Sequence, residues 1–328
     1  RETKAPIGYL LDGKAYTVNG SVAKDTTTQV FEYGVTSAEV PQKVRIRLNK
    51  VDAETGKGES QGAATLAGAV YEVYDSAGNK MDELTTDANG SAVSQELPLG
   101  DYTVRETKAS MGYLVDGQSH VVRASVPKDA TTQVFEYEVE SGEDVIRGNV
   151  EIVKLLENLE ADDDTMEGLS GIEFSFTSKT TGDTVLTIMT DENGFATTAS
   201  DEQPRGTLLY DTYTVTETKY PKGVKPIEPF DVTISRERVT LKGIYKEDKR
   251  IVSPVTVVKR DASTGKAIPM AGVEFRLLDE NKEPVTMTTR YPNEEVHETF
   301  KTNEEGQFTF PNMLKSGTYY LEEQNAPG

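Results

Sequence analysis

The sequence contains one stretch twice, first as RETKAPIGYLLDGKAYTVNGSVAKDTTTQVFEY (residues 1–33) and again as RETKASMGYLVDGQSHVVRASVPKDATTQVFEY (residues 105–137). The two copies align without a gap at an offset of 104 residues. The motif YTVRE at residues 102–106, which overlaps the start of the second copy, recurs as YTVTE at residues 213–217 and as YYLEE at residues 319–323. The glutamates that close these motifs are spaced by 104, 111 and 106 residues, and they are Glu2, Glu106, Glu217 and Glu323. A fixed period of this length indicates a series of similar domains.

Three further landmarks recur in the same period. A lysine ends an alternating run in RIRLNK, NVEIVK and VTVVK, which gives Lys50, Lys154 and Lys259. A small-residue motif follows as LAGAVYEVY, LSGIEFSF and MAGVEFRL, and then a turn as TTDANG, MTDENG and KTNEEG. We therefore expect the end of one repeat (residues 1–41), two whole repeats (42–143 and 144–250) and the start of a fourth (251–328). We also expect this sequence to be a window on a longer array.

The pattern within each period is that of β-strands. Short runs alternate apolar and polar side chains, as in Val44, Ile46 and Leu48, and Asp-x-Asn-Gly turns separate them. No window of twelve residues holds a persuasive helical stripe. Some seven short strands in roughly 105 residues predict a β-sandwich, so the expected fold class is all-β, with tandem Ig-like or prealbumin-like sandwiches. Short polar joints at residues 36–43, 141–148 and 246–254 favour an extended rod.

Composition narrows the function classes. The 328 residues carry a formal charge of −20, which argues against nucleic acid or an anionic membrane surface as a partner. No cysteine is present, so disulfides and cysteine nucleophiles are excluded. The two histidines, His120 and His297, stand alone, which argues against a histidine triad or a metal cluster. No apolar run approaches the length of roughly 18 residues that a membrane span needs.

The strand parity directs two charged side chains inward in each repeat. Lys50 continues the apolar face of Val44, Ile46 and Leu48, and Lys154 and Lys259 continue the same face of their own strands. The glutamates follow Tyr and Val or Leu residues in the same way, as in Tyr213, Val215 and Glu217. Burying either charge alone costs several kcal/mol, so each needs a partner or must become neutral.

Three interpretations fit this pattern. The lysine and the glutamate could form an internal ion pair, or the lysine could extend to solvent from the strand end. Alternatively, desolvation lowers the pKa of the lysine and raises that of the glutamate, so that a neutral amine faces a protonated acid. Such an amine is a nucleophile, and an Asn or Asp carbonyl held beside it would form an amide and expel ammonia or water.

These strings strongly resemble Cna B-type (SpaA-type) domains, which build stalks and pilins of Gram-positive surface proteins. The E-box of that family resembles YTVRETKA at residues 102–109, and its lysine strand and small-residue motif resemble NKVDAETGK with LAGAVYEVYDSAGN and VVKRDASTGK with MAGVEFRLLDENKE. The resemblance implies an isopeptide bond between the inward lysine and an Asn or Asp near the last strand, with the E-box glutamate as catalyst. It implies the lysines Lys50, Lys154 and Lys259, the glutamates Glu106, Glu217 and Glu323, and Glu2 as the catalyst of the preceding repeat.

The acceptor is where the sequence departs from the family pattern. In the third repeat Asp248 stands at the expected end of the last strand, although Glu247 is the residue in phase with Val239 and Leu241. The first two repeats carry glutamates, Glu32 and Glu136, at the corresponding positions of the sequence, and Glu136 is in phase with Val134. Two later carboxylates, Glu143 and Asp144, are further candidates in the second repeat.

The expected function is a structural stalk on a Gram-positive cell surface, anchored to the cell wall and projecting a distal domain. The expected partners are neighbouring repeats and a host surface or matrix ligand of that distal domain. No cofactor, metal or enzyme site for an outside substrate is expected. One alternative is an adhesin that binds through insertions at residues 201–211 and 290–298. Another is a sortase-polymerised pilus shaft, for which Lys222 in the sequence YPK resembles a pilin lysine.

Overall fold

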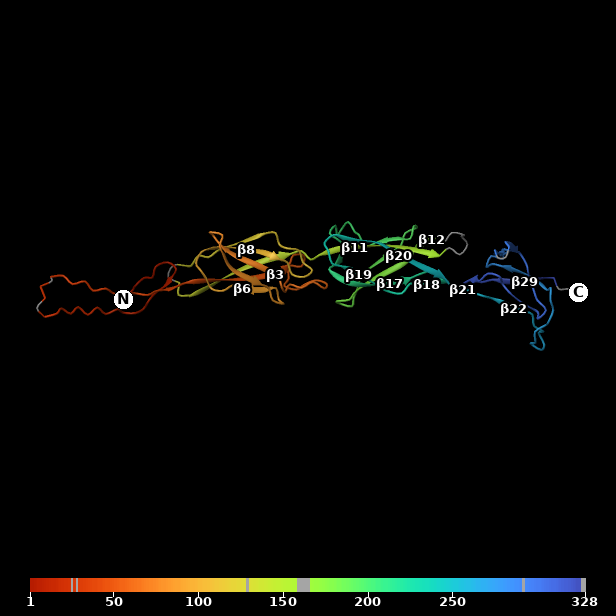
Figure 1. Cartoon of the computed structure of the whole chain (residues 1–328), viewed down its shortest axis with the longest axis horizontal. Coiled ribbons are helices and arrows are strands. Elements are labelled where there is room, and N and C mark those ends of the chain that lie inside the picture. The colour runs from red at the N-terminus through yellow and green to blue at the C-terminus, as the bar shows by residue number, and fades with distance from the viewer. Residues whose placement is uncertain (25, 28, 128–129, 158–165, 291–292, 326–328) are drawn as a thin grey trace.

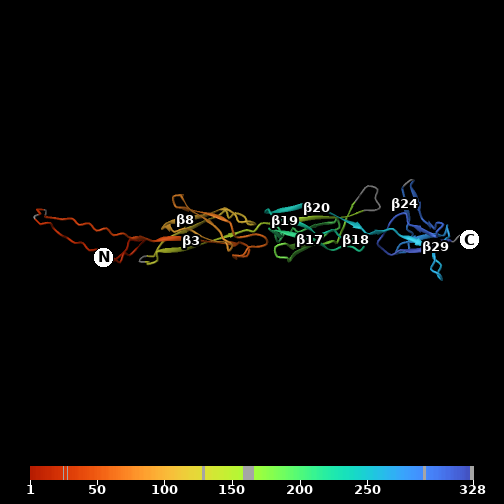
Figure 2. The same cartoon turned by 60° about the horizontal axis from the view of Figure 1, so that its bottom comes forward.

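The computed structural model describes residues 1–328 except 25, 28, 128–129, 158–165, 291–292 and 326–328. The repeats follow one another along a single long axis, and a second view turned by 60° shows the same line (Figures 1 and 2). The described residues form strands, turns and irregular segments without a helix, and so without one that could cross a membrane. The all-β class and the extended rod predicted from the repeats are confirmed. The ranges predicted above serve below as the names of the repeats.

The second repeat is a sandwich of two sheets. One sheet has the order β10-β3-β6, with β7 also paired to β3, and the other has the order β5-β4-β8-β9. The strands are β3 (Lys43–Asp52), β4 (Val70–Asp75), β5 (Lys80–Thr85), β6 (Ser91–Val93), β7 (Leu97–Pro98), β8 (Asp101–Lys108), β9 (Ser119–Arg123) and β10 (Val134–Glu143). Every second residue of β3 is buried, from Val44 to Asp52, because alternate side chains of a strand point to the same face. This face packs on Tyr71, Val73 and Val104 of the opposite sheet.

The third repeat has the same architecture. Its sheets have the orders β12-β11-β20-β18, with β15 and β16 also paired to β11, and β14-β13-β17-β19. The strands are β11 (Arg147–Glu157), β12 (Met166–Gly168), β13 (Glu173–Ser178), β14 (Thr184–Met189), β15 (Phe195–Thr197), β16 (Leu208–Leu209), β17 (Asp211–Lys219), β18 (Val224–Lys225), β19 (Phe230–Ile234) and β20 (Val239–Arg250). Val150, Ile152, Phe174 and Val215 are fully buried between the sheets.

The first and last strands of each whole repeat lie side by side and parallel. β3 pairs with β10 from Lys43↔Val134 to Asp52↔Glu143, and β11 pairs with β20 from Gly148↔Val239 to Leu156↔Asp248. The chain therefore enters and leaves each repeat along neighbouring strands that point in the same direction.

The two outer segments are built from smaller sheets, of two or three strands each. In the first, β1 (Tyr9–Leu10) pairs with β2 (Val40–Pro41). The fourth has its own apolar core, which includes Val273, Leu277 and Phe300. Its strands are β21 (Val252–Ser253), β22 (Thr256–Val258), β23 (Glu274–Leu278), β24 (Met287–Thr289), β25 (Glu295–His297), β26 (Phe300–Lys301), β27 (Gln307–Thr309), β28 (Leu314–Lys315) and β29 (Tyr320–Asn325).

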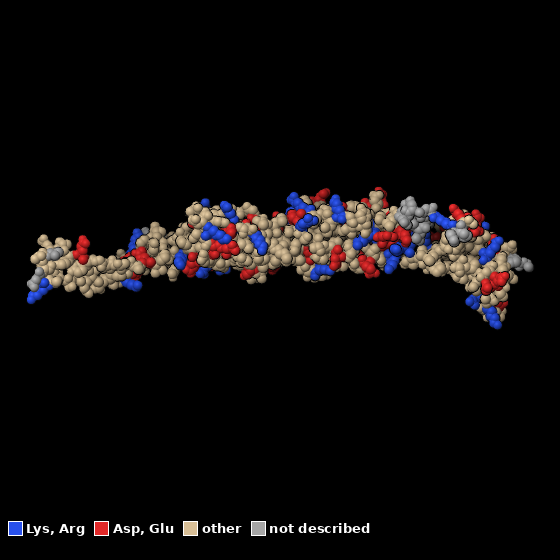
Figure 3. All heavy atoms as spheres, in the orientation of Figure 1, with Lys and Arg blue, Asp and Glu red and all other residues tan. Residues whose placement is uncertain are grey.

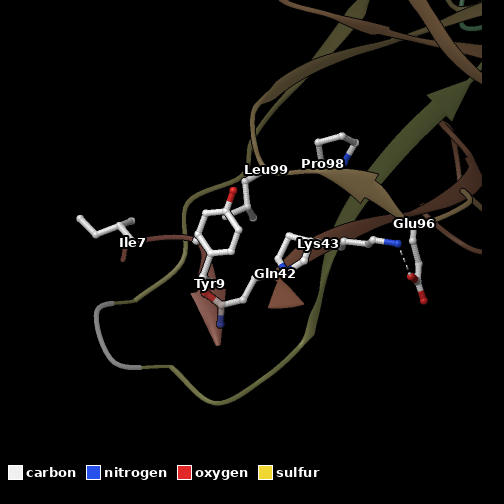
Figure 4. A pocket seen from close by; sticks show the side chains of 9 residues that line it. Ile7, Tyr9, Gln42, Lys43, Glu96, Pro98 and Leu99 are labelled. Carbon is white, nitrogen blue, oxygen red and sulfur yellow. Dashed lines mark hydrogen bonds and ion pairs between the residues drawn. The ribbon is translucent and has the colours of Figure 1, made fainter. Parts of the chain in front are cut away.

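One hydrogen bond recurs at each of the three joints. The residue that follows the last strand region donates its N–H to a glycine carbonyl of the repeat it leaves. The pairs are Gln42 to Gly8 (2.8 Å), Ile146 to Gly112 (2.8 Å) and Ile251 to Gly223 (2.9 Å). At the first joint, Tyr9 faces Leu99 across a pocket edged by the ion pair of Lys43 and Glu96 (3.1 Å; Figure 4). The repeats are therefore fastened to each other by the same backbone contact.

The joint between the second and third repeats is also held by side chains. Arg147 donates two hydrogen bonds to the Glu54 carboxylate, at 2.8 and 2.6 Å. Tyr210 packs with Tyr113 and Val145 in a small apolar cluster. The segment 201–211, considered above as a binding insertion, supplies Tyr210 to this joint.

The joints are shorter than predicted. Residues 141–143 belong to β10, where Ser141 and Glu143 are buried, so only residues 144–146 separate β10 from β11. Asp248 is likewise buried within β20. Three polar residues that resembled linker sequence, Ser141, Glu143 and Asp248, are thus part of the sandwich interior. On the surface, charges of both signs are interspersed over the face drawn in Figure 3.

Candidate functional site

The turn landmark fixes the backbone of each inward lysine. The N–H groups of Lys50, Lys154 and Lys259 donate to the carbonyls of Gly90 (2.8 Å), Gly194 (2.7 Å) and Gly306 (2.9 Å). Gly194 has a φ of +76°, and a Cβ there would lie 2.2 Å from the Lys154 carbonyl oxygen. Glycine is therefore required at this turn, both for its conformation and for its close approach to the lysine strand.

The E-box glutamate is fixed by a shift in strand register. Glu106, Glu217 and Glu323 lie opposite Tyr71, Phe174 and Phe275, and in each repeat the register shifts by one residue next to that aromatic residue. The glutamate carboxylate also accepts a hydrogen bond from the N–H ten residues later. Glu2 accepts it from Asp12 (2.8 Å), Glu106 from Asp116, and Glu217 from Ile227 (3.2 Å).

In the third repeat three charged side chains meet in the core. Lys154 Nζ lies 3.1 Å from Glu217 Oε2 and contacts Asp248 Oδ1, and all three side chains are 0% exposed. Burial raises the pKa of Glu217, and the carboxylate of Asp248 adds to that rise. The residues predicted here from the repeat pattern and the family resemblance thus lie within contact distance of one another.

Asp248 points inward because β20 contains a bulge. Val150 pairs with Leu241 and Ile152 with Ile244, so two residues of β20 oppose one residue of β11. Gly243 in this bulge has a φ of +72°. The extra residue moves the later residues of β20 to the opposite phase, which is why parity counted from Leu241 favoured Glu247. In the structure Glu247 is half-buried and Asp248 is fully buried.

In the second repeat the partner of Lys50 is Glu143. Lys50 Nζ contacts Glu143 Oε2 and lies 3.7 Å from Glu106 Oε1, and the three side chains are 0% exposed. The phase that would turn Val134 and Glu136 inward is wrong. Phe135, Tyr137 and Val139 pack against the core, whereas Glu136 is exposed and accepts a hydrogen bond from Arg47 at 2.6 Å.

Further polar groups surround the Lys50 site. The Tyr71 hydroxyl donates to Glu143 Oε1 and lies 3.0 Å from Ser141 Oγ. Ser141 donates in turn to Asp116 Oδ2 at 3.0 Å. Desolvation lowers the pKa of Lys50 to about 8 and raises the pKa of Glu106.

The contribution of Tyr71 and Ser141 was not predicted from the sequence pattern. The signal that could have revealed Tyr71 is its position in the small-residue motif, where the third and fourth repeats have Phe174 and Phe275. A tyrosine in place of a buried phenylalanine needs a hydrogen-bond partner, and that partner is the Glu143 carboxylate.

The outer segments contain less complete versions of the site. Lys259 Nζ lies 2.6 Å from Glu323 Oε1, but the side chains are 22% and 43% exposed, and Leu321 is 40% exposed. The inward burial expected for this glutamate strand is therefore not found. No described lysine forms an ion pair with Glu2. The described residues bring together a lysine, an E-box glutamate and a second carboxylate in the two central repeats.

These features define a class of protein: tandem β-sandwich repeats with a buried lysine held between two carboxylates from opposite sheets. The family model of the SpaA prealbumin-like fold domain matches residues 44–139, 156–248 and 253–328. The chain therefore belongs to this family.

Two relatives illustrate the likeness. The trypsin-resistant surface T6 protein of Streptococcus pyogenes serotype M6 is 30% identical over 115 residues, which are 35% of this chain and 18% of that protein. The structure of the Bacillus anthracis TIE protein superposes with a TM-score of 0.55 at 24% identity, over 88% of this chain and 47% of that one. This chain spans less than half the length of either protein, and the structural likeness concerns the fold.

Proposed function

We propose that this chain is part of a structural stalk on a Gram-positive cell surface, and that its repeats are locked by intramolecular isopeptide bonds. The observation on which the proposal rests is the fully buried contact of Lys154 with Glu217 and Asp248, which joins the first strand of the repeat to the last. Membership of the SpaA family and the similarity to a surface protein of Streptococcus pyogenes support a surface role.

The bond would form between Lys154 Nζ and Cγ of Asp248. The ammonium of Lys154 first transfers a proton to the carboxylate of Asp248; the resulting amine then attacks the carboxylic acid, and the hydroxyl of that acid leaves as water. Glu217 accepts a proton from the amine and returns one to the leaving hydroxyl, so it ends the reaction unchanged. The product is a neutral amide in place of a buried ammonium and a buried carboxylate, which removes their desolvation cost. Each repeat would perform this reaction once, without an outside substrate.

The position of the bond suits a tether under tension. A pulling force enters the third repeat at the start of β11 and leaves it after β20. With Lys154 joined to Asp248, the force passes along β11, through the amide and out of the repeat. The 94 residues that the bond encloses are then outside the load path. The recurring backbone contact at the joints, and the Arg147–Glu54 pair, would keep consecutive repeats in line.

Mass spectrometry of the full chain tests this function. We expect a tryptic peptide in which Lys154 is joined to the fragment Glu247–Lys249, lighter by one water than its two parts. Glu217→Ala and Asp248→Ala should each abolish it, whereas Glu247→Ala should leave it intact. Recovery of the two unmodified peptides from the folded wild-type chain would overturn the proposal and leave a buried ion pair at this site.

A further inference from the structure

The second repeat places a glutamate where the third has its aspartate. Glu143 lies opposite Asp52, two residues after Lys50, and Asp248 lies opposite Leu156, two residues after Lys154. The two carboxylates therefore occupy the same site in the parallel strand pair. Glutamate is one methylene longer than aspartate, and the Glu143 carboxylate contacts Lys50 Nζ across the interior of the sandwich.

The residues around Glu143 differ from those around Asp248, and the differences match the longer side chain of Glu143. The Tyr71 hydroxyl donates to Glu143 Oε1, which leaves Oε2 toward the lysine. At the position of Tyr71 the third repeat has Phe174, and at the position of Ser141 it has Lys246. The longer acceptor is thus accompanied by a hydroxyl that orients it, whereas the shorter one has none at that position.

A permanent ion pair accounts poorly for this site. One lysine faces two carboxylates there, Glu106 and Glu143, while Asp116, one hydrogen bond further away at Ser141, has its own partner in His120 at 2.8 Å. An excess of buried negative charge is costly unless a carboxyl group is protonated. Burial also lowers the pKa of Lys50, which increases the share of the nucleophilic amine at neutral pH.

We infer that the second repeat forms an isopeptide bond between Lys50 Nζ and Cδ of Glu143, with a glutamate as the acceptor and Glu106 as the proton shuttle. This inference rests on the proposed function, since Glu106 would act as Glu217 does in the third repeat.

The atoms balance as they do for an aspartate acceptor. The ammonium of Lys50 and the carboxylate of Glu143 first exchange a proton and become an amine and a carboxylic acid. The amine nitrogen forms a bond to Cδ, and the C–OH bond breaks with loss of one water. Glu106 takes the second amine proton and delivers it to the leaving hydroxyl. No oxidant, reductant or co-reactant is needed.

The test uses the full chain and reads both sites in one digest. We expect a branched tryptic peptide that joins the Lys50 segment to the Glu143 segment, lighter by one water than the sum of the two. Lys50→Arg, Glu143→Ala and Glu106→Ala should each remove this peptide. The matched control is Glu136→Ala, which removes an exposed glutamate of the same strand and should leave the peptide unchanged.

A second variant covers the case in which these substitutions unfold the repeat. Glu143→Gln keeps the shape of the side chain, and its reaction with Lys50 expels ammonia instead of water. The cross-linked product is then chemically identical to the wild-type product, so the two chains should have the same intact mass. A wild-type chain that retains the water which the bond would expel would overturn the inference.

The Lys154–Asp248 peptide of the third repeat distinguishes failure of this inference from failure of the proposed function. If the Lys154–Asp248 peptide is recovered and the Lys50–Glu143 peptide is not, the glutamate acceptor is refuted while the proposed function stands. If neither cross-linked peptide is recovered, both are refuted.

Discussion

The second and third repeats hold a lysine in the same way but place different second carboxylates beside it. In both, a turn glycine fixes the lysine backbone, and a register shift directs the E-box glutamate inward. The second carboxylate is Glu143 beside the Tyr71 hydroxyl in one repeat and Asp248 in the other, where Phe174 replaces the tyrosine. The contact with the lysine amine is nevertheless made in both.

This difference separates what the fold fixes from what side chains adjust. The lysine and the glutamate are set by backbone hydrogen bonds and strand register, which leave little freedom. The proposed acceptor lies at the end of the last strand, where we expect side-chain length and one hydrogen bond to decide whether its carboxyl carbon reaches the amine. On this proposal a glutamate and an aspartate serve the same position, and the neighbouring aromatic residue changes with them.

The largest expected effect is on stability. Glu106→Gln and Glu217→Gln should each prevent one bond and lower the free energy of unfolding of that repeat by about 4–5 kcal/mol. The reason is that a covalent bond closes a loop of 94 residues between Lys154 and Asp248 in the unfolded chain. The closed loop has less conformational entropy to lose on folding, which stabilises the folded repeat by that amount. Calorimetry of the full chain should show one transition moved down in each variant.

Glu136→Gln and Glu247→Gln are the matched controls, because they remove a charge from the last strands β10 and β20 of the same repeats without touching the lysines. If the unfolding temperature of a repeat does not change in its E-box variant, that repeat is held by an ion pair and not by an isopeptide bond.

The second effect concerns the length of the acceptor. Glu143→Asp should slow bond formation in the second repeat by about 100-fold, because it withdraws the carboxyl carbon by about 1.5 Å and loses the Tyr71 hydrogen bond. The reverse change, Asp248→Glu, adds a methylene to a site whose three side chains are already 0% exposed, and overpacking should destabilise that repeat by about 1–3 kcal/mol. The time course is followed by intact mass after refolding, and equal rates for Glu143→Asp and wild type would contradict the role of length.

The repeat period, the fold class and the lysine and glutamate positions could be predicted from sequence, because alternation is regular in those strands. The acceptors depend on features that alternation does not encode. In β20 an extra residue at Gly243 reverses the phase before Asp248. In β10, Val134 and Phe135 are both apolar, so either phase fits the pattern, and only packing against the opposite sheet selects Phe135.

The third effect isolates the hydroxyl that distinguishes the repeats. Tyr71→Phe gives the second repeat the aromatic residue of the third, and we expect Lys50–Glu143 bond formation to slow by about tenfold. A hydrogen bond to a charged group contributes about 1.5–3 kcal/mol, and part of that orients the carboxylate toward the amine. The rate is read by intact mass during refolding, with the third repeat of the same chain as the internal control. An unchanged rate would mean that burial alone holds Glu143 in place.

The smallest expected effect is a pH dependence in the second repeat. Desolvation lowers the pKa of Lys50 to about 8, so roughly a tenth of the amine is neutral at pH 7 and about half at pH 8. The proton that leaves Lys50 must pass to Glu143 to make a carboxylic acid, and a proton lost to solvent leaves a carboxylate that the amine does not attack. Bond formation between Lys50 and Glu143 should therefore be about twofold slower at pH 8 than at pH 7. The chain is recovered unfolded from inclusion bodies, refolded by dilution at each pH, and sampled by mass spectrometry over time. A rate that rises over this range would show that loss of the lysine proton to solvent, and not its transfer to Glu143, activates the amine.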